Sequence, residues 1–365
     1  MSSTDVDTVA QAPPPLADRE VRYEHSPGFP KLLEQLGASL LVSTYQAGKV
    51  AVVGARQGAL TLSFHNFDRP MGMATQPGSL AVAARNQVWF LGNKPDIATR
   101  MDPPGTHDAC LLTRSSQVTG EIQAHEMGFG DDGLWVVNTL FSCLCTLHPN
   151  FSFVPRWQPP FISGLAAEDR CHLNGLAMDA GKPRYVTAMS QTDTPAGWRP
   201  DKATTGCLIE VSSGQVVAEG FAMPHSPRVY RGKVWVLDSG RGRLVQVEPA
   251  DGTVETVVEL PGYTRGMTFC DRFALIGLSK IRETSTFGGV PIAEDRAKLK
   301  CGVAVVDLEA GRTVASLSFE SGVDEIFDVA ALPGIRAAAM RGPFATQDGH
   351  ATIWAVPPPD GSDGS

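Results

Sequence analysis

Three histidines, His125, His172 and His225, occupy one equivalent position in three successive segments of the chain. Each lies three residues before the anchor of a short apolar stretch, at Gly128, Gly175 or Arg228. The chain has only eight histidines, so this spacing is informative. Neutral imidazole is a good ligand for Fe, Zn, Mn and Cu. If the three segments converge, their imidazoles would form a facial site for a divalent metal, and Fe(II) fits best.

The same position holds Arg69, Tyr263 and Asp324 in the other three segments. Together with Arg265 and Glu325, they are our candidates for catalytic residues around the metal. Arginines near one point favour a substrate with a carboxylate or phosphate group, although pairing with carboxylates of other segments is an alternative role.

Two further interpretations of the histidines stay open. His65, four residues upstream of Arg69, is a possible fourth nitrogen ligand if its loop folds back. The repeated histidines also have a structural interpretation, in which each one hydrogen-bonds to the backbone of a neighbouring segment.

The elements that would position these residues repeat along the chain. Alternating apolar segments, interpreted as middle strands, begin near residues 39, 79, 133, 184, 232, 273 and 335. Their spacing of about 49 residues is typical of four-stranded propeller blades. Six short apolar stretches, often with glycine, read as innermost strands. The sequence therefore predicts an all-β propeller of seven blades, with six blades as the alternative.

The expected domain covers residues 25–356, with disordered ends at 1–24 and 357–365. The stretch Phe29–Leu36 resembles a short helix, and Arg19–Tyr23 is a possible outer strand that closes the ring. Insertions at 94–114, 191–204 and 280–300 are rich in Pro, Gly, Asp and Thr. We expect all three to lie over one face of the disc and to cover the axial site.

Composition narrows the class of partner. The net charge of −8 and the lack of aromatic residues interleaved with basic ones argue against nucleic acid. No apolar run is long enough to span a membrane, and the polar, acidic start does not resemble a secretory signal. Seven scattered cysteines without a C-x-x-C pair favour reduced thiols in the cytoplasm. No P-loop or G-x-S-x-G motif is present.

Four segments carry a family resemblance: Leu40-Leu-Val-Ser-Thr-Tyr-Gln-Ala-Gly-Lys49, Asn66-Phe-Asp-Arg-Pro-Met-Gly-Met73, His172-Leu-Asn-Gly-Leu-Ala177 and Pro224-His-Ser-Pro-Arg228. They resemble an uncharacterised bacterial family, a conserved family of unknown function with a predicted propeller fold. The resemblance spans residues 25 to 356 and implies the fold without an activity. More loosely, a histidine ring on a propeller axis is similar to the carotenoid-cleavage oxygenases, in which four histidines hold iron, and to propeller lyases with a histidine-bound metal.

These observations lead to three hypotheses. The first is a metal-dependent oxidoreductase or oxygenase that acts on a small molecule or peptide, with His125, His172 and His225 as ligands. The second is a non-catalytic propeller that binds a peptide or protein partner. The third is a lyase or hydrolase, metal-assisted or metal-free, in which a ring histidine is the general base.

Overall fold

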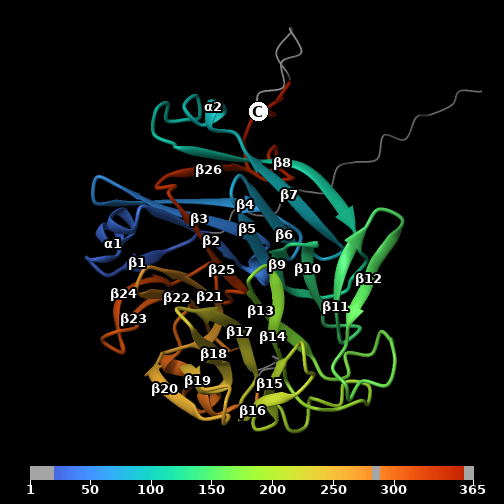
Figure 1. Cartoon of the computed structure of the whole chain (residues 1–365). Helices are drawn as coiled ribbons and strands as arrows, with labels where there is room; N and C mark the ends of the chain where they lie inside the picture. Colours follow the sequence, from blue (N-terminus) through green and yellow to red (C-terminus); the bar gives the residue numbers. More distant parts are fainter. Residues whose placement is uncertain (1–19, 282–287, 357–365) are drawn as a thin grey trace, which may run out of the picture.

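The computed structural model describes residues 20–281 and 288–356, which form six sheets of four or five strands arranged around one axis (Figure 1). Among these residues, all strand pairs are antiparallel except one. Each sheet is one blade, so the propeller prediction is confirmed. The six innermost strands gather around the middle of the view in Figure 1. The expectation of seven blades is wrong, and the alternative of six is correct.

The blades are numbered here from I to VI along the chain, and each is given from its inner strand outward. Blade I contains β25 (Asp328–Pro333), β2 (Ala38–Ser43), β3 (Lys49–Arg56) and β4 (Ala59–Asn66). Blade II contains β5 (Met73–Gln76), β6 (Ser79–Ala83), β7 (Gln87–Asn93), β8 (Ala109–Val118) and β26 (Ala338–Arg341). Blade III contains β9 (Ala124–Gly130), β10 (Gly133–Asn138), β11 (Cys143–His148) and β12 (Phe151–Trp157).

The other three blades follow the same order. Blade IV contains β13 (Leu173–Asp179), β14 (Lys182–Ala188), β15 (Gly206–Glu210) and β16 (Val216–Phe221). Blade V contains β17 (Pro224–Tyr230), β18 (Lys233–Asp238), β19 (Arg243–Val247) and β20 (Val254–Glu259). Blade VI contains β21 (Tyr263–Cys270), β22 (Phe273–Ser279), β23 (Gly302–Asp307), β24 (Arg312–Phe319) and β1 (Tyr23–His25).

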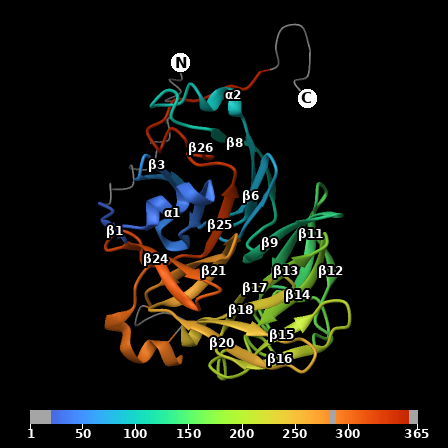
Figure 2. The ribbon, with the colours of Figure 1, turned by 60° about the vertical axis from the view of Figure 1, so that its left-hand side comes forward.

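Blade I is assembled from both ends of the described chain. Its inner strand β25 pairs antiparallel with β2 from Ala38↔Pro333 to Ser43↔Asp328. Figures 1 and 2 show β25 in red, beside blue strands from the beginning of the chain and orange strands from its last third. This pairing closes the ring and explains why no inner strand precedes β2 in the sequence.

The segment expected to begin a seventh blade near residue 335 is a strand, but it belongs to another blade. As β26 it pairs in parallel with β8, from Ala338↔Ala109 to Arg341↔Leu112. At the other end of the chain, β1 pairs with β24, so the expected outer strand near residue 23 is present on blade VI. Both surplus strands extend existing sheets instead of building a new one.

Short helices connect some of these strands. The helix expected over Phe29–Leu36 is present as α1 and has Gly37 in the left-handed conformation at its end. The other helical elements are α2 (Pro95–Ala98), η1 (Tyr45–Ala47), η2 (Ser239–Arg241) and η3 (Pro291–Lys298). Among the described residues, none of the helices is long and apolar enough to cross a membrane. The expected disorder at 1–19 and 357–365 lies outside the described residues.

The glycine anchors of the inner strands permit close contact between neighbouring blades. A Cβ atom on Gly72 would lie 2.6 Å from the His125 carbonyl oxygen of blade III. One on Gly266 would lie 2.5 Å from Cα of Asp328 in blade I. Such distances leave no room for a side chain. The crowding around the axis therefore accounts for the repeated small residues.

The apolar core is divided among the interfaces between blades. One cluster, which includes Leu40 and Val303, joins blades VI and I, and another, which includes Leu41 and Leu80, joins blades I and II. Four similar clusters fill the other interfaces. The packing holds each blade against both neighbours and fixes the axial ends of the inner strands.

The antiparallel order of strands decides which loops share a face of the disc. We call the face at which the inner strands begin the proximal face. Loops between second and third strands open on it, whereas loops between third and fourth strands open on the opposite face. Residues 189–205 join β14 to β15 and residues 280–301 join β22 to β23, so these two insertions are proximal.

The insertion at 94–108 joins β7 to β8, the third and fourth strands of blade II, and is therefore on the opposite face. The expectation that all three insertions cover one face is wrong for this loop. The physical reason is that this insertion follows the third strand of its blade, whereas the other two follow the second strand. Part of the third insertion, residues 282–287, lies outside the described residues.

Candidate functional site

The three aligned histidines converge at the proximal face, as the repeat spacing predicted. His125 lies on β9, His172 immediately precedes β13, and His225 lies on β17. The ring centroids of His125 and His172 are 4.8 Å apart in an edge-to-face arrangement. Charges on His172 and His225 also influence the pKa of His125, which places all three within electrostatic reach of one another.

His125 and His225 have the same local structure. Nδ1 of His125 lies 3.0 Å from the carbonyl oxygen of Gln123 and 2.8 Å from the hydroxyl of Thr139. Nδ1 of His225 lies 3.0 Å from the carbonyl oxygen of Met223 and 3.0 Å from the hydroxyl of Ser239. These partners lie two residues before and 14 residues after each histidine.

A left-handed residue creates this arrangement in both blades. Gln123 has a φ of 54° and Met223 a φ of 52°, and each precedes its histidine by two residues. The turn brings a carbonyl oxygen onto the imidazole, and the hydroxyl comes from the end of the second strand. These contacts fix the ring orientation from within the same blade, unlike the hydrogen bonds to the backbone of a neighbouring segment that were considered above. They leave Nε2 for other chemistry.

His172 is held differently, by a carboxylate. Its Nδ1 lies 2.9 Å and 3.0 Å from the two oxygens of Asp169. The indole N–H of Trp198, from the insertion between β14 and β15, donates to the same carboxylate at 3.0 Å. The Trp198 ring lies 4.3 Å from the His172 ring, centroid to centroid. An insertion thus packs directly on the site, as expected for a covering loop.

The tautomers of the three histidines follow from these contacts. A carbonyl or carboxylate oxygen accepts a hydrogen bond and does not donate one, so each Nδ1 carries the proton. Each neutral imidazole then has its lone pair on Nε2. None of the hydrogen bonds found among the described residues uses the Nε2 atoms of His125, His172 or His225.

Burial keeps two of the rings neutral. Desolvation, followed by the charges of His172 and Arg265, lowers the pKa of His125 well below its ordinary value of 6.5. Desolvation and Arg265 lower the pKa of His225 in the same way. Both groups are therefore neutral hydrogen-bond acceptors near pH 7.

Arg265 supplies the positive charge next to the histidines. Its guanidinium carbon is 3.4 Å from the centroid of the Phe327 ring, and Phe327 in turn lies 5.2 Å from the His125 ring. Nη1 of Arg265 is 3.5 Å from a carboxylate oxygen of Glu325. Arg265 is only 5% exposed, so its charge is felt strongly in this environment. The candidates Arg265 and Glu325 are thus brought to the site.

The other three ring positions lie at the same face with different surroundings. Tyr263 is buried, its ring is 5.7 Å from that of His225, and its hydroxyl lies 3.8 Å from the sulfur of Met223. Burial raises the pKa of Tyr263, so the phenol stays protonated. Asp324 lies in the loop before β25, where its carbonyl oxygen accepts the N–H of Lys280.

Arg69 lies at the edge of the candidate site. It is exposed, and its guanidinium is 6.0 Å from the ring of Tyr45, which packs on Phe327 with 5.5 Å between ring centroids. Among the described residues, the contacts found between Arg69 and the histidines pass through two aromatic rings, those of Tyr45 and Phe327. It is well placed to meet a ligand that approaches from solvent and less well placed to act on the bond that reacts.

His65 does not join the other histidines. It lies on β4, the outermost strand of blade I, where Nδ1 is 3.8 Å from a carboxylate oxygen of Asp348 and the ring stacks on His350. The proposed folding back of its loop is not observed, because residues 59–66 form a regular strand paired with β3. His65 and the axial histidines therefore belong to different parts of the molecule.

Three charged residues lie next to the histidine ring along the inner strands: Glu126 and Asp328 are buried, and Arg228 is partly buried. Glu126, the residue after His125, forms an ion pair with Arg228 of blade V and accepts the N–H of Leu176 at 2.7 Å. Asp328 of blade I accepts the N–H groups of Met73 and Val329. Desolvation and the charge of Glu126 raise the pKa of Asp328 to about 7. Arg228 thus has the structural, inter-blade role that the sequence left open.

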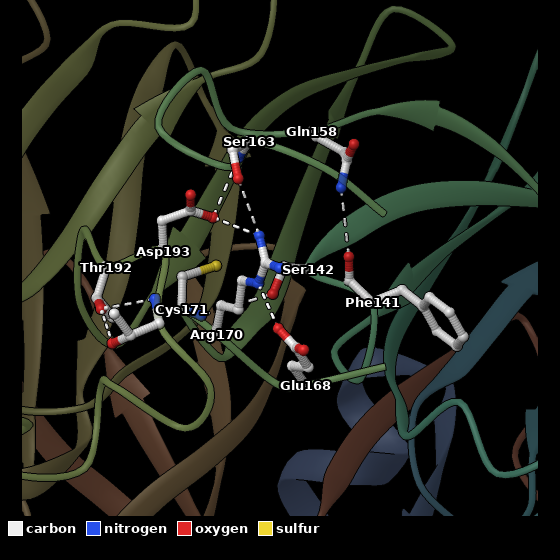
Figure 3. Close-up of polar contacts among 10 residues, drawn as sticks. Phe141, Ser142, Gln158, Ser163, Glu168, Arg170, Cys171, Thr192 and Asp193 are labelled. Carbon is white, nitrogen blue, oxygen red and sulfur yellow. Dashed lines mark hydrogen bonds and ion pairs between the residues drawn. The ribbon is translucent and has the colours of Figure 1, made fainter. Parts of the chain in front are cut away.

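A polar cluster fixes the loop that carries Asp169 and His172 (Figure 3). Arg170 donates to Glu168 at 2.7 Å, to Asp193 at 2.7 Å and to the hydroxyl of Ser163 at 3.1 Å. Because Asp193 belongs to the insertion that carries Trp198, these bonds join the insertion to the loop. The neighbouring Cys171 is fully buried, and burial raises its pKa to about 12, so the thiol stays protonated near pH 7.

The three histidines offer nitrogen atoms of the kind that bind metal ions, but the rings are not grouped as in a formed metal site. In residues 20–281 and 288–356, no group of three or more His, Cys, Asp or Glu side chains is arranged to hold a metal ion. Three Nε2 atoms with their Nδ1 atoms oriented by acceptors do resemble metal-binding histidines. Ligation would require the rings to turn toward a common point.

Sequence reasoning missed two members of this site. Asp169 precedes His172 by three residues, and this i−3 spacing in a loop was a signal for a local contact. Trp198 lies 26 residues further along, within an insertion, and no sequence signal pairs it with either residue. Phe327, three residues after Asp324, also belongs to the site, because the guanidinium of Arg265 stacks on its ring.

The fold and the site define a six-bladed β-propeller with a histidine ring at one end of its axis. The chain belongs to the family described as domain of unknown function (DUF4915), whose model matches residues 27–340. No curated protein matches the chain.

Solved structures support the fold alone. The chain is similar to one in the crystal structure of a nidogen/laminin complex, with a TM-score of 0.51 and 10% identity over 81% of this chain and 99% of that one. It is also similar to a protein of unknown function from Bacteroides caccae, with a TM-score of 0.51 and 11% identity over 81% of this chain and 98% of that one.

Proposed function

We propose that this protein is an enzyme that acts on a small anionic molecule at the proximal face, with His172 as general base. The observation that carries the proposal is the pair of His172 and Asp169. The carboxylate holds the proton on Nδ1, so the lone pair of Nε2 is available to remove a proton from a substrate. A base oriented in this way by an acceptor is a recurrent catalytic arrangement.

The surrounding groups favour a negatively charged substrate. Arg265 carries a buried positive charge close to His125 and His225, and its ion-pair distance to Glu325 is 3.5 Å, longer than that of a direct charged hydrogen bond. A carboxylate or phosphate would gain a strong interaction with this guanidinium. The neutral Nε2 atoms of His125 and His225 would accept hydrogen bonds from hydroxyl groups of the same molecule.

The proposal is tested by proton exchange. Small hydroxy and keto acids are incubated with the protein in D2O, and NMR follows the loss of carbon-bound protons next to the carboxylate. We expect exchange by the wild type and a loss of about 100-fold or more in His172→Gln, the range found for general bases. The matched control is His25→Gln, which lies on the outer strand β1. Exchange that survives in His172→Gln would contradict the assignment.

A second candidate is a metal-dependent enzyme, favoured by one specific observation. All three Nδ1 atoms are engaged by oxygen acceptors, which is the usual state of metal-binding histidines. The metal would be Fe(II), or alternatively Mn, Zn or Cu, and would supply a redox centre or a Lewis acid. His125, His172 and His225 would hold it through Nε2.

Elemental analysis separates the two candidates. Protein purified without a histidine tag and then exposed to Fe(II), Mn, Zn or Cu should retain about one ion per chain if the metal candidate is correct. The His172→Ala variant should then lose it. Exchange activity that persists in metal-free protein supports the general base instead. Neither metal nor turnover would favour a non-catalytic propeller that binds a peptide or protein partner.

A further inference from the structure

Ser63, His65 and Asp348 meet on the outermost strand of blade I, away from the histidine ring. The hydroxyl oxygen of Ser63 lies 3.0 Å from Nε2 of His65. Nδ1 of the same ring lies 3.8 Å from Oδ2 of Asp348. Ser63 and His65 are two residues apart on β4, so their side chains share one face of the strand. Asp348 comes from the segment that follows β26.

The burial of the three residues differs in a way that suits a nucleophile and its base. Ser63 is exposed to solvent, whereas the side chains of His65 and Asp348 are 2% and 1% exposed. Nδ1 of His65 and Oδ2 of Asp348 are both buried without a hydrogen-bond partner among the described residues. A small rotation that brings these two atoms together would satisfy both, and catalytic hydrogen bonds are often long in unliganded proteins.

The carboxylate is positioned by a neighbouring residue. Oδ1 of Asp348 accepts the backbone N–H of Asn66 at 2.9 Å and its side-chain amide at 2.6 Å. Burial opposes ionisation, but the nearby His65 and the two N–H donors of Asn66 outweigh it and lower the pKa of Asp348. An ionised carboxylate only accepts, so Nδ1 of His65 carries the proton. Nε2 therefore accepts from the Ser63 hydroxyl.

The strand edge supplies a donor for a developing negative charge. The N–H of Asn66 points outward to Asp348, whereas that of Phe67 points inward to Gly48. Because successive N–H groups of a strand alternate between its two edges, the N–H of Phe64 points to the same outer edge as that of Asn66. It belongs to the residue directly after Ser63, within reach of an oxyanion formed there.

We propose that Ser63, His65 and Asp348 form a second catalytic site that hydrolyses small esters. The oxygen of Ser63 would bond to the ester carbonyl carbon as His65 Nε2 takes its proton. The ester C–O bond then breaks, and the alcohol leaves with that proton. Water attacks the acyl-serine, its proton passes through Nε2 to the serine oxygen, and a carboxylic acid is released. This logic of nucleophile, base and orienting acid recurs on unrelated folds.

Covalent labelling tests the site. The full-length protein is treated with a fluorophosphonate probe, and the labelled residue is identified by peptide mass spectrometry. Hydrolysis of p-nitrophenyl acetate is measured in parallel. We expect the label on Ser63 and a loss of hydrolysis of at least about tenfold in Ser63→Ala, with an unchanged melting temperature because the side chain is exposed. Asp348→Asn should reduce both signals.

Ser213→Ala is the matched control. Ser213 is also an exposed serine, but its hydroxyl donates to Glu210 at 2.6 Å and touches no histidine. Labelling of Ser63 that does not exceed labelling of Ser213, or hydrolysis that persists in Ser63→Ala, would overturn the proposal. A label that remains at full rate in a folded His65→Gln variant would overturn it as well. Ser63 and His65 lie on the outermost strand of blade I, whereas His172 precedes the inner strand of blade IV. These results therefore do not depend on His172.

Discussion

The carboxylate of Asp169 lies 2.9 Å from Nδ1 of His172, three residues further along the same loop. The loop therefore carries its own acceptor for the imidazole, unlike the loops before β9 and β17, which use a carbonyl and a hydroxyl group. His172 is in this respect the distinct member of the histidine ring. The carboxylate of Asp169 also accepts a hydrogen bond from the indole N–H of Trp198, which lies in the insertion between β14 and β15.

We expect Asp169 and Trp198 to be energetically coupled. Asp169→Asn and Trp198→Phe each remove the charged hydrogen bond between carboxylate and indole, so the double variant should lose it only once. The coupling energy should be about 1 kcal/mol, within the range for residues in contact. Urea unfolding of the two single variants and the double variant measures it. Strictly additive effects would show that the indole bond contributes nothing.

The second prediction concerns the glycine anchors. Gly266→Ala should destabilise the fold by at least about 2 kcal/mol more than Gly78→Ala. Both glycines have a φ of +76°, so the backbone strain is the same in the two variants. A Cβ atom on Gly266 would meet Asp328 of the next blade at 2.5 Å, whereas nothing lies within 4 Å of one on Gly78. Equal free energies of unfolding would contradict the role assigned to crowding at the axis.

Much of this architecture could be predicted from the sequence. The six inner segments and the aligned histidines were found because each blade repeats one order of strands, and rotation brings equivalent positions to one axis. The helix at Phe29–Leu36 was found because its apolar residues follow a helical spacing.

The wrong predictions for the strand near residue 335 and for His65 have a common physical cause. A strand pattern shows that residues 335–341 are extended, but it does not show which sheet edge they join. In the structure they join β8 in parallel, more than 200 residues earlier in the chain. The same limit explains why His65 was considered as a fourth ligand on the condition that its loop folds back. Its contact with Asp348 crosses 283 residues, 348 minus 65, and leaves no periodic signal.

The third prediction concerns Asp328. Its pKa in the folded protein is about 7, against an ordinary value of 3.8. Between these values the folded state binds the proton more tightly than the unfolded state, so the contribution of Asp328 to stability falls as the pH rises from 4 to 7. Relative to Asp328→Asn, the wild type should therefore lose stability over this range and level off above pH 7. Urea unfolding at each pH measures the difference.

Asp271→Asn is the control for that series, because the Asp271 side chain is 66% exposed. Over the same pH range, the difference for Asp328→Asn should change more than the difference for Asp271→Asn. Equal changes in the two variants would contradict the raised pKa of Asp328.

The fourth prediction concerns His125 and His225, whose effect on stability changes with pH in the direction opposite to that of Asp328. The pKa values of His125 and His225 lie below 6.5 in the folded protein. The unfolded chain takes up protons first as the pH falls, so each histidine costs stability below pH 6.5. His225→Asn should reduce the slope of unfolding free energy against pH between 5 and 6.5 by up to about 1.4 kcal/mol per pH unit. NMR of the imidazole nitrogens should show both rings neutral at pH 6.

The pairing of β25 with β2 also governs when the protein becomes folded during synthesis. The nascent chain leaves the ribosome with β2 first, yet the partner of that strand begins only at Asp328. Until then, blade I has a bare apolar edge, which is a template for unwanted strand pairing. The helix α1 contacts β2 and β3 of the same blade and precedes them in the chain, so it is available to shield that part of the chain. Completion of the ring is therefore a late step that must wait until β25 has been synthesised.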